Sequence, residues 1–339
     1  MHMHVAQLGT PGSPTGFMSR AMQDSIPFKI FLLYARIPAN QANDARLRQG
    51  AIDVIKSSGV DRVVCLALDA VYDDGGTQRL DRSTLFVPND FVFGLQADLP
   101  DRILVGASVH PYDPKFKQRV TDAVTRGAAL LKWLPSAQQI NLADPRVGQA
   151  LRFLASAGPS GRPLPLLLHV GTEGAIISTD PHTMSYDFLS WGFWDKVGNA
   201  LRPKSKRWLT PDLANLHANL RSGLDAGACI IFAHCGLPYF APSAFSKVLE
   251  HNDIDVVADY LTRYPGQNGT IRGKAFADVS ACVTPFRQSY FPQIAALRKE
   301  SVLVGSDFPV GKTVALKPFV CRQYEFVLKI KYVRTYAAT

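Results

Sequence analysis

Three apolar runs in this chain each end in a residue type that commonly binds a metal. These are residues 164–168 before His169, residues 229–233 before His234, and residues 302–306 before Asp307. A continuous apolar run that is closed by Gly or Pro is typical of a strand buried on both faces. Such strands form parallel sheets covered by helices, and in a barrel of parallel strands the catalytic residues lie at the strand C-termini. Two histidines and an aspartate at these ends are a reasonable ligand set for a divalent metal.

The rest of the chain alternates between predicted strands and helices. The strand candidates are residues 62–70, 103–109, 128–134, 164–170, 228–234, 275–282 and 302–306. Between them, Asn43 is a candidate N-cap for a helix that reaches Ser58, and Asp144 followed by Pro145 starts another. Thr210 and Pro211 are expected to start a third. This alternation predicts a parallel sheet.

We expect residues 1–339 to form one domain, with residues 172–226 as an insertion after the fifth strand. This segment contains Trp191, Trp194 and Trp208 beside several basic residues. Loops of this length are usually functional lids or separate subdomains. A lid over the site and an aromatic patch packed on the surface both remain open for this segment.

Composition and cysteine usage indicate an ordinary globular protein. The chain is 47% hydrophobic and 19% charged, and no apolar run approaches the roughly 20 residues that span a membrane. The N-terminus shows no basic cluster followed by an apolar core, as a secretory signal would. The five cysteines include no CxxC pair, so a reducing compartment is favoured and we expect a cytoplasmic protein.

The net charge of +9 is concentrated in two stretches. Residues 196–207 and 312–334 each carry a net charge of +5, and the remaining chain sums to −1. No nucleic-acid-binding motif accompanies this charge, so we expect neither a nucleic acid nor a membrane as partner. The sequence leaves open whether the chain forms a homo-oligomer.

A further pair of histidines stands at the start of the chain. His2 and His4 are separated by one residue, so on an extended segment both side chains point to the same side. Both could therefore face one metal ion. On its own an HxH pair is weak evidence, but it gains weight from the three later strand ends.

In this order the motifs resemble the amidohydrolase superfamily, in particular its amidohydrolase-related (amidohydrolase 2) branch. The matching segments are residues 131–136, 144–146, 167–171, 233–236 and 305–309, so the resemblance covers essentially residues 1–310. It implies a (β/α)8 TIM-like barrel with a divalent metal at its C-terminal mouth.

The resemblance also implies roles for individual residues. The metal ligands would be His2, His4, His169 and Asp307, with one ion favoured over two and Zn2+ as the expected metal. Asp307 would handle the proton of the attacking water, and His234 would stabilise the developing oxyanion. Lys132 stands where binuclear members carry a carboxylated, bridging lysine. We interpret it as a plain lysine that pairs with a carboxylate or points at the substrate.

Three further residues and the chain start complete the predicted site. His110 is expected to line the pocket without being a ligand. Asp278 and Ser280 could stand behind the ligands or serve packing, and packing is favoured. In the family an apolar first strand precedes the HxH pair, whereas here the chain starts one residue before His2. We therefore expect a largely truncated first strand, exposed edges on its neighbours and weakened metal binding.

The leading functional hypothesis is a metal-dependent hydrolase that cleaves a C–N or C–O bond (amide, ester or lactone) of a small molecule. The alternative within the same branch is a metal-dependent decarboxylase of an aromatic or muconate-type acid. A barrel that no longer catalyses is a third hypothesis. Basic residues near the mouth would favour an anionic substrate, and residues 196–207 are a candidate source.

Overall fold

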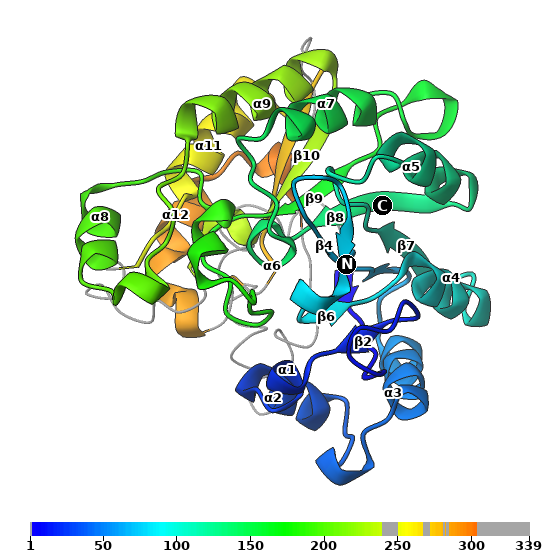
Figure 1. Cartoon of the computed structure of the whole chain (residues 1–339). Coiled ribbons are helices and arrows are strands. Elements are labelled where there is room, and N and C mark those ends of the chain that lie inside the picture. The colour runs from blue at the N-terminus through cyan, green and yellow to red at the C-terminus, as the bar shows by residue number, and fades with distance from the viewer. Residues whose placement is uncertain (1, 239–249, 267–271, 281, 283–284, 304–339) are drawn as a thin grey trace.

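The computed structural model describes residues 2–238, 250–266, 272–280, 282 and 285–303. At its centre lies a parallel sheet that curls and carries helices on its outer side (Figure 1). Its eight described strands are β1 (His2–His4), β3 (Val63–Leu66), β7 (Ile103–Ala107), β8 (Ala128–Trp133), β9 (Leu166–His169), β10 (Cys229–Ala233), β11 (Lys274–Asp278) and β12 (Val302–Leu303), in this order across the sheet. The predicted TIM-like barrel is confirmed by this arrangement.

The helices between the strands form the outer layer. They are α3 (Asp44–Ser57), α4 (Asn89–Asp98), α5 (Phe116–Thr125), α7 (Pro145–Leu154), α9 (Leu213–Ala226) and α11 (Ile254–Arg263). Shorter helices lie in the connections, namely α1 (Arg20–Gln23), α2 (Ile26–Tyr34), α6 (Pro135–Gln138), α8 (Phe193–Ala200) and α12 (Phe291–Ala296). Two small antiparallel pairs join β2 (Phe17–Met18) to β6 (Leu85–Phe86) and β4 (Val71–Tyr72) to β5 (Gln78–Arg79).

Side-chain caps fix the starts of the predicted helices. The side chain of Asn43 accepts a hydrogen bond from the Arg46 amide at 2.9 Å, and Asp144 caps α7 with Pro145 at its first turn. The third helix starts later than expected, because Asp212 rather than Thr210 accepts from a backbone amide of its first turn. Helix α9 lies against α7 and therefore belongs to the outer layer of the barrel. The insertion proper is thus residues 172–212, which contain α8 and irregular connections.

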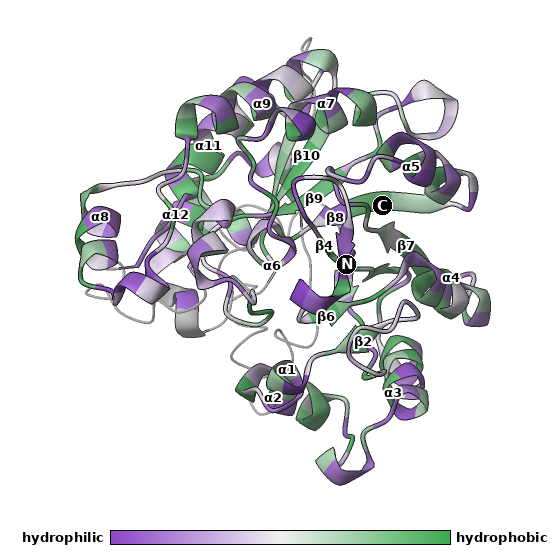
Figure 2. Ribbon diagram, in the orientation of Figure 1, coloured by the Kyte–Doolittle hydropathy of each residue, from purple (hydrophilic) through white to green (hydrophobic). Residues whose placement is uncertain are grey.

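Alternation along the strands separates the interior of the barrel from the layer beneath the helices. Leu66, Leu167 and Ala233 form an interior cluster, whereas Met3 and Cys65 belong to the larger core under the helices. Because strand residues alternate between faces, positions two residues beyond interior residues also face the interior. His169 lies two residues after Leu167 and therefore faces the interior. Figure 2 shows β9 and β10 coloured apolar, as expected for strands covered on both faces.

The first strand is short, as predicted, but all three of its residues pair with β3. His2, Met3 and His4 lie in parallel register with Val64, Cys65 and Leu66. The expected exposure of the β3 edge is therefore wrong over these three positions. His2 is buried within the barrel, and its ring approaches His234, which follows β10, and Asp278 of β11.

Candidate metal centre

The two N-terminal histidines point to the same side of β1, as predicted from their spacing. Their ring centroids lie 6.2 Å apart, with the planes nearly perpendicular. His2 is buried, and its Nδ1 atom lies 3.3 Å from Oδ2 of Asp278 at the end of β11. The first and seventh strands of the sheet thus contribute side chains to one interior site.

His169 is the last residue of β9 and lies between two carboxylates of the insertion. Its Nε2 atom is 3.1 Å from Oε2 of Glu173, and its Nδ1 atom is 3.5 Å from Oδ2 of Asp187. Asp187 ends the 3-10 helix η4 (Pro181–Asp187), and its Oδ1 atom accepts from the Ser136 amide at 3.1 Å. The backbone oxygen of Asp187 also accepts from the Gly171 amide. The insertion is therefore tied to the strand ends at this histidine.

His234 follows β10 in a strained turn. His234 and Cys235 have φ values of 54° and 56°, and Gly236 continues in the left-handed region at 70°. Non-glycine residues in this region store strain, which is frequent at functional sites. Nδ1 of His234 donates to the carbonyl oxygen of Ser280 at 2.9 Å. The hydroxyl of Ser280 in turn donates to Asp278 at 2.5 Å.

Three of these imidazoles share one arrangement. His2, His169 and His234 each turn Nδ1 toward an oxygen behind the ring, and we call them the histidine cluster. The oxygens belong to Asp278, Asp187 and Ser280 respectively. Such contacts favour a proton on Nδ1 and are typical of metal-binding histidines, while Nε2 of His169 also lies 3.1 Å from Oε2 of Glu173. The His169–Asp187 contact is electrostatic, since 3.5 Å exceeds a normal hydrogen bond and Oδ2 of Asp187 has no hydrogen-bond partner.

The rings of the histidine cluster are close together. The His234 ring lies 6.4 Å from that of His2 and 5.4 Å from that of His169. Imidazoles on one zinc ion, with Zn–N distances of about 2.0–2.1 Å, have centroids roughly 5 Å apart. Within the described part of the chain, however, no three His, Cys, Asp or Glu side chains converge as a complete metal-binding group. The fourth predicted ligand, Asp307, lies outside the described residues.

Lys132 is fully buried on β8, in register with Leu167 of the neighbouring strand. Its charge acts on Asp187, whose pKa burial raises to about 7 while hydrogen bonds from Ser136 and the charge of Lys132 oppose the rise. Pairing of Lys132 with a carboxylate stays a prediction, and Asp187 is the carboxyl group on which its charge acts. A buried lysine is otherwise costly.

Several residues of this site were missed or given another role from sequence. Glu173 and Asp187 were not singled out, because they lie in the irregular insertion without a recognisable motif. The packing role expected for Asp278 and Ser280 is wrong, since Ser280 contacts His234 and Asp278 contacts His2. The available signal was their position two residues apart at the end of a predicted strand.

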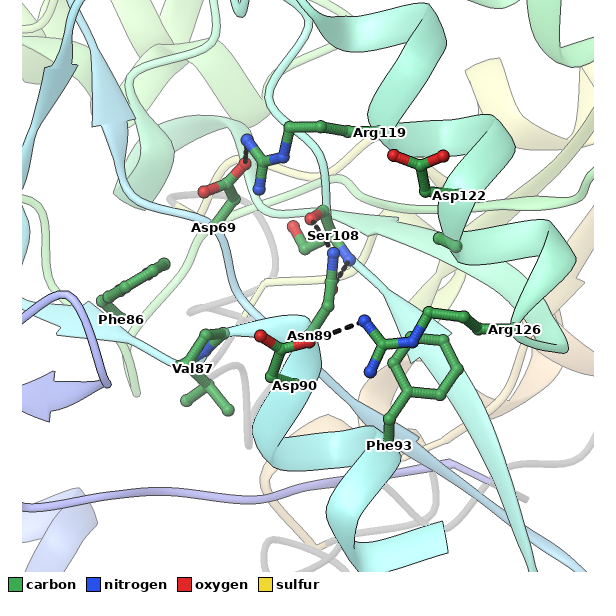
Figure 3. Close-up of a pocket in the computed structure, with 12 residues that line it drawn as sticks. Asp69, Phe86, Val87, Asn89, Asp90, Phe93, Ser108, Arg119, Asp122 and Arg126 are labelled. Atoms are coloured by element: carbon green, nitrogen blue, oxygen red, sulfur yellow. Dashed lines mark hydrogen bonds and ion pairs between the residues drawn. The ribbon is translucent and has the colours of Figure 1, made fainter. Parts of the chain in front are cut away.

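A second polar cluster lies at the ends of β3 and β7, beside a cavity of about 220 Å3 between α4 and α5 (Figure 3). Its centre is Arg119, whose guanidinium lies 3.1 Å from Asp69 and 2.5 Å from Asp113. The Tyr72 hydroxyl donates to Asp113 and accepts from Arg119. We call Asp69, Tyr72, Asp113 and Arg119 the arginine cluster. Each of these residues has a partner within the cluster.

His110 adjoins the arginine cluster and has both ring nitrogens occupied. Nε2 donates to the carbonyl oxygen of Gln138 at 3.0 Å, and Nδ1 accepts from the Tyr112 amide at 3.1 Å. Burial lowers the pKa of His110 to about 3. This buried, neutral ring has no nitrogen left for a metal, in agreement with the prediction that His110 is not a ligand.

The basic residues of the insertion lie on the surface. Lys196, Lys204 and Lys206 are exposed on α8 and the adjoining 3-10 turn. Trp191 and Trp208 pack around Phe188, so part of the segment is the aromatic patch that was one of the two interpretations. None of the helices in the described residues is both long and apolar enough to cross a bilayer.

Comparison with solved structures shows what the fold is similar to. An uncharacterised TIM-barrel protein from Bordetella bronchiseptica matches at a TM-score of 0.50 and 11% identity, over 98% of this chain and 92% of the other. An amidohydrolase from Burkholderia multivorans matches in two crystal forms, one with bound HEPES and one with bound zinc. Each form has a TM-score of 0.50 and 12% identity, over 98% of this chain and 91% of the other.

No family model matches the chain, and no curated protein matches it. At 11–12% identity the structural matches establish the fold and not the activity. The predicted TIM-like barrel agrees with the fold of these structures.

Proposed function

We propose that this chain is a metal-dependent hydrolase of the amidohydrolase type, acting on a C–N or C–O bond of a small molecule. The observation that carries the proposal is the gathering of His2, His4, His169 and His234 at the strand ends, where neighbouring rings lie 5.4 to 6.4 Å apart. Two of the proposed ligands, His2 and His169, also turn Nδ1 toward a carboxylate behind the ring, as metal-binding histidines commonly do. The zinc bound in the similar amidohydrolase structure supports the same choice of ion.

The charges around the cluster also favour a divalent cation. Asp187, Glu173 and Asp278 bring three carboxylates to the site, and Lys132 is the cation whose charge acts on Asp187. Side chains of Asp187 and Asp278 are almost completely buried. Buried carboxylates need a cation or hydrogen bonds to remain ionised. A dipositive ion would balance the excess of negative charge.

The ion would be held by His2, His4, His169 and Asp307, as the resemblance implies. One Zn2+ ion suits this set of neutral imidazoles and a carboxylate. A bound ion of this kind lowers the pKa of water toward neutrality and polarises a carbonyl group. Side chains would carry out the proton transfers. Asp307 would take the proton of the attacking water and pass it to the leaving group.

His234 would stabilise the oxyanion. Because Nδ1 already donates to Ser280, the ring donates at Nε2 only in its protonated form. Lys132, beside Asp187, would orient the substrate. The insertion would cover the site as a lid, since Asp187 and Glu173 reach His169 from it.

Metal analysis combined with an activity panel tests the proposal. We expect one divalent ion per chain, loss of activity on chelation and recovery with Zn2+. The panel would contain amides, esters and lactones, together with aromatic and muconate-type acids. Release of carbon dioxide from an acid would establish the decarboxylase instead. Purified protein that neither holds a metal nor regains one would contradict both assignments and favour the non-catalytic barrel.

A further inference from the structure

A buried arginine lies beside the turn that carries His234. Arg287 belongs to the 3-10 helix η7 (Pro285–Tyr290), which follows β11, and its exposed fraction is 4%. Its Nε atom donates to the carbonyl oxygen of Pro238 at 2.7 Å. Pro238 stands four residues after His234 in the loop that leaves β10. This single bond fixes the guanidinium at the C-terminal end of that strand, where barrel enzymes bind their substrates.

One end of this guanidinium is unsatisfied. The Nη1 atom of Arg287 is buried and has no hydrogen-bond partner, although most buried polar atoms in folded proteins have one. An unsatisfied charged donor is costly, and such a group calls for an explanation such as a ligand or an ordered water. Among the described residues, no carboxylate lies within ion-pair distance of Arg287.

The positive charge acts on the neighbourhood of His234. The pKa of the adjacent Cys235 thiol is raised by its hydrogen bond to Cys282 and by burial, and the charge of Arg287 opposes that rise. Arg287 is thus near enough to influence the residue next to the proposed oxyanion-stabilising histidine.

Arg119, a partly exposed arginine at the ends of β3 and β7, has different partners. Arg119 is held by the two carboxylates of Asp69 and Asp113 and serves the structure. Arg287 has a backbone carbonyl on one side and an unused N–H on the other. A cation that the described residues leave without a counter-ion is suited to an anionic ligand.

We propose that Arg287 binds a carboxylate of the substrate, so that the enzyme acts on small carboxylic acids. The planar guanidinium offers its Nη edge to two carboxylate oxygens, while the Nε bond to Pro238 holds its orientation. This inference rests on the proposed function and specifies its substrate class. It also moves the source of anion recognition from the exposed lysines of residues 196–207 to one buried residue.

Paired ligands that differ only in charge test the proposal. Acetate, benzoate and succinate are titrated into the metal-loaded enzyme, each beside its amide (acetamide, benzamide and succinamide). We expect at least one acid to bind roughly 10- to 100-fold more tightly than its amide, and Arg287→Met to remove most of that difference. Arg287→Lys should restore part of it. Binding of the acid to the metal contributes equally in the wild type and in Arg287→Met. The difference in acid affinity between the two proteins therefore measures the contribution of Arg287.

Arg263→Met is the matched control, because Arg263 is exposed on α11 and pairs with Asp259. It should leave acid binding unchanged. The Nε–H resonance of Arg287 in the unmodified enzyme, assigned with Arg287→Lys, should also shift on adding the acid that binds best. This reading does not depend on the folding of Arg287→Met.

Acid affinities that are equal to those of the amides, or an Arg287 resonance unmoved at saturation, would overturn the proposal. Metal content is measured on the same samples. Absence of metal after reconstitution would instead contradict the proposed function, so the two failures are distinguishable.

Discussion

The histidine cluster and the arginine cluster occupy strand ends of the same barrel, but their charges are balanced differently. In the arginine cluster, Arg119 lies between Asp69 and Asp113, and Tyr72 completes the hydrogen bonds. Figure 3 shows Arg119 beside Asp69. In the histidine cluster, oxygens of Asp278, Asp187 and Ser280 stand behind the imidazoles, and Oδ2 of Asp187 has no hydrogen-bond partner.

This difference separates a structural network from a candidate site. A closed network of paired charges stabilises its surroundings and has no group left for a ligand. Under the proposed function, the histidine cluster and the carboxylates around it would take a cation from outside the chain. Position at a strand end is common to both clusters, so it is the pairing of each polar atom that distinguishes them.

The largest expected effect comes from removing a ligand of the histidine cluster. His169→Asn should reduce bound metal from one ion per chain to a small fraction, with activity falling by more than ~100-fold, beyond the range seen for outer-shell partners. Elemental analysis of dialysed protein measures the metal. His110→Asn is the matched control, since both nitrogens of His110 are occupied. If both variants lost metal equally, the histidine cluster could not be distinguished as the metal site.

The strand ends were predictable because their signal is local. An apolar run and the residue that closes it are adjacent in sequence, and alternation then decides which face the side chain occupies. His169 and Lys132 were placed in this way, and the structure puts both inside the barrel. The HxH pair was predictable for the same reason.

The partners behind the histidines depend on the order of strands and the path of the insertion. Asp187 reaches His169 only after a long irregular segment, and Asp278 meets His2 because the sheet curls. No periodicity encodes these contacts, and neither does any motif. Arg287 was missed because a single arginine after a strand is indistinguishable in sequence from an ordinary surface residue.

The arginine cluster should respond in stability rather than in metal content. Arg119→Met leaves Asp69 and Asp113 without their cation and should lower the free energy of unfolding by about 3 kcal/mol, the lower end for a broken buried pair, since Arg119 is partly exposed. Urea unfolding measures this. Arg126→Met is the control, because its partner Asp90 is largely exposed and such pairs contribute about 1 kcal/mol or less. A fall in metal content with unchanged stability would reverse the roles of the two clusters.

Acid should weaken the arginine cluster through His110. Burial lowers its pKa from 6.5 to about 3, so the folded state favours the neutral ring. Its contribution is complete above pH 6.5 and is lost as the pH falls toward 3, because the unfolded chain then binds a proton that the folded chain does not. At about 1.4 kcal/mol per pH unit, the loss reaches about 2 kcal/mol at pH 5. Between pH 7.5 and pH 5, the free energy of unfolding should fall less in His110→Asn than in the wild-type protein. An equal fall in both would contradict the role given to His110.

The smallest effect tests whether Asp187 belongs to the metal site or only to the insertion. Asp187→Asn keeps an oxygen for the Ser136 amide but removes the charge facing His169. Metal affinity should fall about tenfold, at the lower end for outer-shell partners, since the contact is 3.5 Å long. Stability should change little, because burial already disfavours the ionised carboxyl and raises its pKa to about 7.

Competition with a chelator measures the metal affinity of Asp187→Asn. Unchanged affinity would assign Asp187 to packing of the insertion and leave His169 with Glu173 as its partner in the cluster.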